Sequence, residues 1–189
     1  MATEFLLVNG SPRPRGNSAR LAEVCGAEFD RLGRSWERID LRSLRIHPCA
    51  GCWRCRDHEA RYCAQRDDMA PLYDQVADCK GLLLLSPVYW FNVSAQLKTF
   101  IDRLDGLWHW NRDFLRRKPV GAVLVYMDET PEASGAVHAM AALDHLFRYV
   151  GADCRGFACG SAENPGDADR NPALLDRVRG LARSLALTT

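Results

Sequence analysis

The sequence lacks the features that would assign it at once to a membrane, secreted or nucleic-acid-binding class. No apolar run approaches the roughly 18 residues that a membrane-spanning helix needs. The N-terminal Met-Ala-Thr-Glu lacks the basic region and long apolar stretch of an export signal, so a cytoplasmic protein is expected. Lys and Arg number 25 against 24 Asp and Glu, and this balance argues against a basic nucleic-acid surface.

Cysteine, in contrast, is abundant, with eight residues in the chain. A chain of 189 residues, 47% of them hydrophobic, can bury a core without disulfides, so a metal or redox site is the better interpretation. Four cysteines form the pattern Cys-x2-Cys-x2-Cys-x7-Cys: Cys49, Cys52, Cys55 and Cys63. Three interpretations stay open: a [4Fe–4S] cluster, thiols without a metal, or zinc, which usually prefers two separated Cys-x-x-Cys pairs.

Short apolar runs alternate with stretches of helical periodicity along the chain. The predicted strands are 4–9, 36–41, 81–86, 120–127 and 154–159, and the predicted helices are 17–32, 67 or 68 to 79, 95–108, 134–150 and 172–185. This alternation predicts an α/β fold, a doubly wound parallel sheet in one domain over residues 1–189, with a cysteine-rich insertion at 46–67. In such sheets, ligands bind beyond the carboxyl ends of the strands.

The turn after the first strand holds many hydrogen-bond donors, in Gly10-Ser11-Pro12-Arg13-Pro14-Arg15-Gly16-Asn17-Ser18. It precedes a helix N-terminus, whose free N–H groups and partial positive charge favour phosphate. It has neither the Gly-Lys-Ser/Thr of a Walker A loop nor the Gly-x-Gly-x-x-Gly of dinucleotide sites, so a mononucleotide phosphate fits it better. The alternative is an ordinary turn in which Asn17 or Ser18 caps the helix.

Three adjacent aromatic residues follow the third strand, in Ser86-Pro87-Val88-Tyr89-Trp90-Phe91-Asn92. At the mouth of a parallel sheet they offer an apolar wall on which a flat ring can stack. The alternative is that they only pack between helix and sheet. The loop after the fourth strand, Tyr126-Met127-Asp128-Glu129-Thr130, is expected to approach the ring from the other side. Its carboxylates would disfavour a ring that gains negative charge, so they point to solvent or to a partner.

The two loops resemble those of the NAD(P)H-dependent FMN reductase family. The resemblance lies in Gly10-Ser11-Pro12-Arg13 with Gly16-Asn17-Ser18, in Ser86-Pro87-Val88-Tyr89-Trp90, and in Ser94-Ala95-Gln96-Leu97-Lys98 with Phe100-Ile101-Asp102-Arg103. It implies a flavodoxin-like fold with five strands in the order 2-1-3-4-5. It also implies that FMN contacts Ser11, Arg13, Gly16, Asn17, Ser18, Pro87, Val88, Tyr89, Trp90, Phe91, Asn92 and Met127. Relatives are often glycine-rich where this chain has Asp128 and Glu129.

The cysteine segment is similar to the compact motif of iron–sulfur flavoproteins, a branch of the same family that joins a [4Fe–4S] cluster to FMN. The residues that carry this likeness are Cys49-Ala50-Gly51-Cys52-Trp53-Arg54-Cys55, Cys63 and Asp67-Asp68-Met69. The resemblance implies that Cys49, Cys52, Cys55 and Cys63 ligate the cluster.

Together the resemblances imply an FMN-dependent oxidoreductase that takes hydride from NAD(P)H and reduces a quinone, a flavin or another small acceptor. Because FMN carries the chemistry, no catalytic acid or base is expected. The alternative is an iron–sulfur flavoprotein that carries electrons with a ferredoxin-type partner. A homodimer or homotetramer is expected, with no nucleic-acid or membrane partner. No dedicated nicotinamide motif distinguishes NADH from NADPH.

Overall fold

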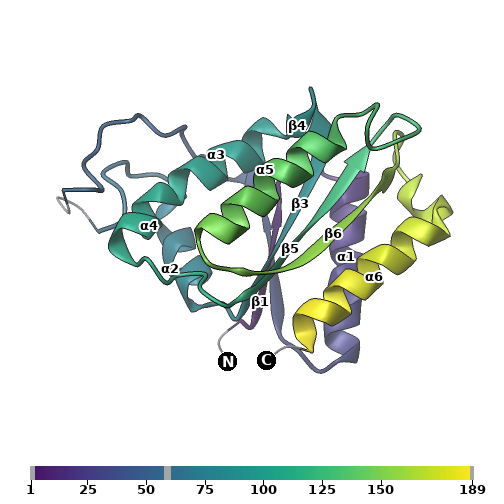
Figure 1. The fold of residues 1–189 in the computed structure, drawn as a ribbon, viewed down its shortest axis with the longest axis horizontal. Coiled ribbons are helices and arrows are strands. Elements are labelled where there is room, and N and C mark those ends of the chain that lie inside the picture. Colours follow the sequence, from purple (N-terminus) through teal and green to yellow (C-terminus); the bar gives the residue numbers. More distant parts are fainter. Residues whose placement is uncertain (1–2, 58–60, 188–189) are drawn as a thin grey trace.

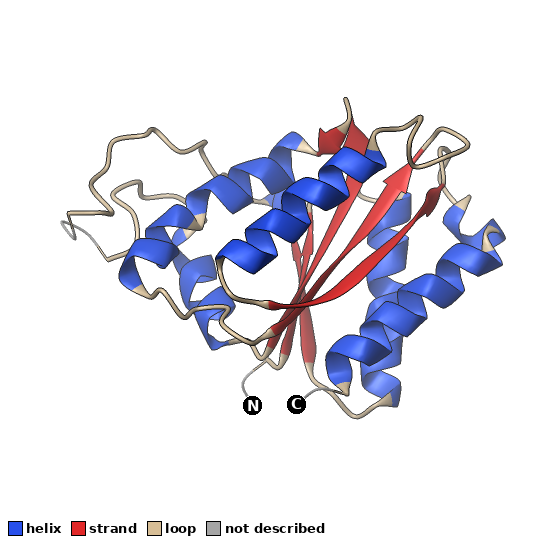
Figure 2. Cartoon of the chain, viewed as in Figure 1, coloured by secondary structure: helices blue, strands red, loops and turns tan. Residues whose placement is uncertain are grey.

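The computed structural model describes residues 3–57 and 61–187. One twisted parallel sheet runs through the molecule, with helices on both faces (Figure 1, Figure 2). Its order is β2-β1-β3-β5-β6, which confirms the predicted doubly wound sheet and strand order, although a short sixth strand adds to the five predicted. The strands are β1 (Phe5–Asn9), β2 (Trp36–Asp40), β3 (Gly81–Tyr89), β5 (Pro119–Tyr126) and β6 (Asp153–Ser161).

The strand order reverses between β1 and β3, because the chain first adds β2 on one side of β1 and then β3 on the other. The register pairs Asn9 with both Asp40 and Leu85, and Pro87 with Val125. The carboxyl ends of these strands therefore lie along one edge of the sheet. The loops that follow β1, β3 and β5 emerge side by side at that edge.

Six helices cover the sheet within the described residues. α1 (Asn17–Arg31) and α6 (Pro172–Ala186) lie on one face, and α2 (Ala70–Asp78), α3 (Ala95–Arg103), α4 (Asp105–Trp110) and α5 (Ala136–Tyr149) lie on the other. Two short 3-10 turns, Leu41–Ser43 and Ala168–Arg170, lie between elements. No helix in the described parts of the chain combines the length and apolarity required to cross a bilayer.

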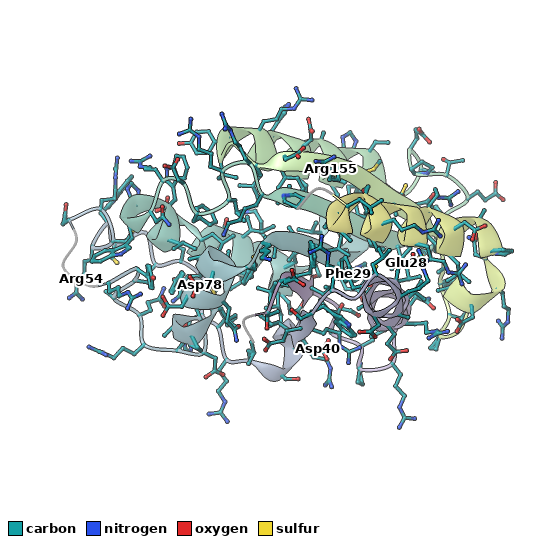
Figure 3. The ribbon with its side chains drawn as sticks, turned by 90° about the horizontal axis from the view of Figure 1, so that it is seen from below. Glu28, Phe29, Asp40, Arg54, Asp78 and Arg155 are labelled. Atoms are coloured by element: carbon teal, nitrogen blue, oxygen red, sulfur yellow. The ribbon has the colours of Figure 1, made fainter. Side chains whose placement is uncertain are left out.

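Alternation along the strands divides the core between the two faces. Leu6 points to the α2–α5 side, whereas Phe5 stacks on Phe29 of α1 with ring centroids 4.6 Å apart. Burying one such aromatic side chain contributes roughly 2–3 kcal/mol. Glu28 lies beside Phe29 (Figure 3), and its carboxylate accepts hydrogen bonds from Arg31 and from Arg183 of α6. The bond from Arg183 therefore connects α1 to α6 in addition to their apolar packing.

The structure differs from the sequence prediction at two places near the sheet edge. Strand β3 continues to Tyr89 and turns back into a two-residue antiparallel strand, β4 (Asn92–Val93). The predicted helix 95–108 is divided at Leu104, whose N–H bonds to the carbonyls of both Phe100 and Ile101 and so tightens the turn.

The cysteine segment is fixed to the helical layer by a buried ion pair. The Arg103 guanidinium of α3 donates to both carboxylate oxygens of Asp67, at 2.6 and 3.1 Å, and to the carbonyl of His47. Burial raises the pKa of Asp67, but hydrogen bonds from Arg103 and from the N–H groups of His47 and Met69 outweigh it and lower that pKa to about 2. The helix predicted to start at 67 or 68 begins instead at Ala70, with Met69 as its N-cap.

Asp67→Asn is expected to destabilise the protein by about 3 kcal/mol, because it leaves the buried Arg103 charge uncompensated. The folded-state pKa of Asp67 is depressed from its ordinary 3.8 to about 2, so its stabilisation is complete above the higher value. The stabilisation is lost as pH falls through the folded-state pKa of about 2. The Asn variant has no carboxylate at this position, so its stability should lack that acid-dependent loss. Urea unfolding followed by circular dichroism over this pH range measures both effects.

A matched control for this measurement is Asp113→Asn, which removes an exposed carboxylate paired with Arg116. Exposed pairs contribute about 0–1 kcal/mol, so the control should unfold nearly as the parent does. An equal, small effect of the two substitutions would show that Asp67 does not hold the segment.

Candidate functional site

A cavity of about 220 Å³ opens at the edge of the sheet where β1, β3, β5 and β6 end. Most residues predicted to contact FMN line it: Ser11, Arg13, Gly16, Asn17, Ser18, Pro87, Val88, Tyr89 and Met127. The structure therefore brings the loops after β1, β3 and β5 to one site. Its lining includes the turn before α1, which is the predicted phosphate end, and Tyr89 with Met127, which are the predicted ring end.

The turn before α1 is braced by its own hydrogen bonds. The Ser11 N–H donates to Asn9 Oδ1 at 3.1 Å, and the Arg13 N–H donates to Ser11 Oγ at 3.2 Å. Asn9 in turn donates to Asp40 at the end of β2. A Cβ at Gly16 would lie 3.0 Å from the Arg13 Cβ, so glycine lets the turn close tightly over the helix N-terminus.

Ser18 supplies the clearest sign of a ligand. Its side chain is buried, and its Oγ has no hydrogen-bond partner among the described residues, although it lines the cavity. A buried hydroxyl left unpaired costs about 1–3 kcal/mol. It lies in the first turn of the 15-residue helix α1, where free N–H groups and the helix dipole favour an anion. These residues fit a phosphate group.

Asn17 is not the helix cap that the alternative interpretation of this turn makes it. The N-cap of α1 is Gly16, and Asn17 is the first helical residue. Its side-chain amide donates to the carbonyls of Ala162 and Asn164, each at 2.9 Å, and its Oδ1 accepts from the Ala168 N–H. The predicted N-cap is therefore wrong: Asn17 joins the loop after β6 to the turn before α1.

The loop after β6 is the part of the site that the sequence did not reveal. No site residue was predicted in it, yet Ala162, Glu163 and Asn164 line the cavity. Arg13 donates to the carbonyl of Glu163 at 3.5 Å. Val125 of β5 also lines the cavity without having been predicted, whereas Tyr126 begins the segment that was expected to approach the ring. The only available signal was the position of the loop after a strand, because it contains no recognisable motif.

The aromatic end of the site is divided between cavity and solvent. Tyr89 lines the cavity and is 38% exposed, and Met127 opposite it is 66% exposed. Trp90, Phe91 and Asn92 lie at the tip of the β3–β4 hairpin and are not among the residues that line the cavity. Their predicted contact with FMN stays a prediction.

The four clustered cysteines line one small cavity of about 110 Å³, together with Asp105. The Cys55 thiol donates to Asp105 Oδ2 at 3.7 Å, and burial and this carboxylate raise the pKa of Cys55. Among residues 3–57 and 61–187, no group of three or more His, Cys, Asp or Glu side chains is placed to hold a metal ion. The arrangement of these thiols thus does not fit an assembled metal centre.

The cysteine segment projects at the left of Figure 1, beyond α3 and α4, whereas β3, β5 and β6 end at the upper right. Arg54, between two of the cysteines, lies at the extreme end of the molecule (Figure 3). The candidate site at the sheet edge and the cysteine segment are therefore separate places on this chain.

Residues 3–156 match the family model described as NADPH-dependent FMN reductase. The chain belongs to this family. An iron–sulfur flavoprotein of Archaeoglobus fulgidus is 33% identical over 160 residues, which cover 84% of this chain and 68% of that protein. An iron–sulfur flavoprotein of Methanocaldococcus jannaschii is 32% identical over 187 residues, which cover 95% of this chain and 93% of that protein.

The fold of this FMN reductase family member is also found in an NAD(P)H:quinone oxidoreductase from Methanothermobacter marburgensis. The TM-score is 0.73 at 16% identity, with 98% of this chain and 96% of that chain covered. The family match confirms the predicted recognition and oxidoreductase class, and the structural likeness confirms the flavodoxin-like fold.

Ser18→Ala should weaken FMN binding about tenfold, because it removes a donor that has no partner in the ligand-free chain. The free energy of unfolding of the apoprotein should stay equal or rise, since an unpaired buried hydroxyl is lost. Quenching of flavin fluorescence on titration gives the affinity, and urea unfolding gives the stability.

Asn17→Ala is the contrasting variant, because it removes partners from three backbone groups. It should lower the stability of the apoprotein as well as the affinity for FMN. If Ser18→Ala binds FMN as tightly as the parent, the unpaired hydroxyl is not a phosphate ligand.

Proposed function

We propose that this protein oxidises NAD(P)H through FMN held at the sheet edge and passes the electrons to a quinone, a flavin or another small acceptor. The observation that carries the proposal is the unpaired, buried Ser18 hydroxyl, which lines one cavity together with Arg13 and Tyr89. A single anionic group at one end and a flat ring at the other describe a mononucleotide such as FMN.

In this proposal, some of the lining residues bind the phosphate and others contact the ring. Ser11, Arg13 and Ser18 bind the phosphate, with Arg13 adding a charge-assisted contact. Val88, Tyr89 and Met127 contact the ring and orient it. When bound, FMN supplies hydride acceptance and electron transfer, so the chain needs only to hold the ring and leave one side open to substrates.

Purified protein is expected to be yellow or to take up added FMN, and NADH or NADPH should bleach the flavin absorption anaerobically. Arg13→Ala should lower FMN affinity roughly tenfold, since a charge-assisted hydrogen bond contributes about 1.5–3 kcal/mol. Arg177→Ala on α6, which removes an arginine outside the cavity lining, is the matched control. Protein that neither contains nor binds FMN would refute the proposal.

The second candidate is an iron–sulfur flavoprotein that carries electrons with a ferredoxin-type partner. It is favoured by the gathering of Cys49, Cys52, Cys55 and Cys63 around one cavity and by the names of the A. fulgidus and M. jannaschii relatives. Iron and sulfide analysis of anaerobically purified protein decides whether a cluster is present. Fast reduction by ferredoxin with slow NAD(P)H oxidation would favour the carrier, and the reverse would favour the reductase.

We also propose a homodimer or homotetramer. An apolar groove of about 410 Å³ lies between α4 and α5, and Tyr149 at its rim is 70% exposed while its ring contacts that of Trp108. A second copy that covers this groove would bury the exposed ring. Light scattering on the parent and on Tyr149→Glu tests this, since a charge in the groove should favour the monomer.

A further inference from the structure

The tip of the β3–β4 hairpin is built from two aromatic residues in a backbone conformation that suits neither. Trp90 and Phe91 have φ values of 46° and 65°, in the left-handed region that bulky residues rarely adopt. The Trp90 side chain is 93% exposed. Such strain persists only where the surroundings impose it, and it gathers at functional sites.

Phe91 provides the support that holds this tip. A Cβ at Gly135, just before α5, would lie 2.2 Å from a ring carbon of Phe91 and 2.7 Å from its Cα. The absence of that Cβ lets Phe91 seat directly on the backbone of Gly135. Phe91 is thus anchored, Tyr89 lines the cavity, and Trp90 between them is presented to solvent at the mouth of the site.

The loop that leads from the cavity to Gly135 is acidic. It starts at Met127, which lines the cavity, and it carries Asp128, Glu129 and Glu132. None of these three carboxylates forms a salt bridge or a side-chain hydrogen bond within the described chain. The cationic Arg13 lines the cavity with Ser11 and Ser18, where a bound phosphate would offset its charge.

We propose that the Trp90 tip and this acidic loop form an acceptor platform that selects planar cationic heteroaromatic acceptors over anionic ones. The proposal rests on the proposed function, because it names the class of acceptor that would be used at the same site. An exposed indole attracts a cation over its face, and unpaired carboxylates nearby attract the same charge. The carboxylates repel an anion, and the indole face does not attract one.

N-methylphenazinium is a probe of this class. In the overall reaction, NADH and the N-methylphenazinium cation become NAD+ and neutral 5-methyl-5,10-dihydrophenazine. Two electrons and one proton move from donor to acceptor, so the charge of the acceptor is lost in the reaction. The platform would therefore bind the oxidised acceptor more tightly than the reduced product, which favours product release.

The first test compares kcat/KM for N-methylphenazinium with kcat/KM for the anion dichlorophenolindophenolate, with FMN-loaded protein and NADH, after correction for direct reaction. Asp128→Asn/Glu129→Gln/Glu132→Gln should lower the cation-to-anion ratio about fivefold, and raised salt should lower it in the parent. Asp113→Asn/Asp144→Asn/Asp176→Asn changes net charge equally on other surfaces and should leave the ratio unchanged. Equal ratios in both variants would overturn the proposal.

The second test measures binding without turnover. Calorimetric titration of the oxidised protein with N-methylphenazinium should show binding that Trp90→Ala weakens about threefold. Hexaammineruthenium(III), a cation with no flat face, should bind the parent and Trp90→Ala equally. If Trp90→Ala instead changes only the oligomeric state in light scattering, the tip is an interface between copies and the platform is refuted.

These tests separate the platform from the proposed function. If NAD(P)H fails to reduce the bound flavin, the proposed donor is wrong, and protein reduced with dithionite can be mixed with both acceptors in stopped flow to test selectivity. If the protein binds no FMN, the proposed function fails, and the calorimetric comparison of parent and variants still decides the platform.

Discussion

The buried first turn of α1, at the point where strand order reverses, is the constraint on which the site depends. It presents the Ser18 hydroxyl with no partner, inside a turn closed by Gly16 and braced through Ser11. The protein keeps this unfavourable arrangement because the sheet fixes both ends of the turn: β1 is buried along its whole length, and α1 packs on α6. An anion that accepted a hydrogen bond from this donor would offset the cost of leaving it unpaired.

The electrostatics of the site follow from this division into two ends. Cationic Arg13 and the α1 N-terminus belong to the phosphate end, and Asp128 and Glu129 follow directly after the residue that lines the ring end. Carboxylates beside a ring that gains negative charge on reduction disfavour the reduced form. The same charges therefore act in two ways, on the tendency of a bound ring to give up electrons and on the charge of molecules that approach it.

A feature of the fold or of the site could be predicted from the sequence when the residues that determine it are close together along the chain. The buried strand at 81–86 and the turn after β1 are encoded within a few neighbouring residues, so pattern and spacing were sufficient. The bonds of Asn17 to Ala162, Asn164 and Ala168 join positions far apart in the sequence, and no local pattern reveals them. The β3–β4 hairpin was missed for a related reason. Its turn uses Trp90 and Phe91 where Asn or Gly would be the usual signal, and its cause is the contact with Gly135.

The cysteine segment shows how a fold can fix a segment without assembling its thiols. Its anchors are the Asp67–Arg103 ion pair and the backbone of Tyr62, which approaches Gly106 so closely that a Cβ there would lie 2.7 Å from the Tyr62 carbonyl oxygen. These anchors hold the segment, and the Cys55 thiol adds a hydrogen bond to Asp105 of α4. The segment is therefore positioned by Arg103 of α3 and the backbone at Gly106 of α4, apart from the strands that build the sheet-edge site.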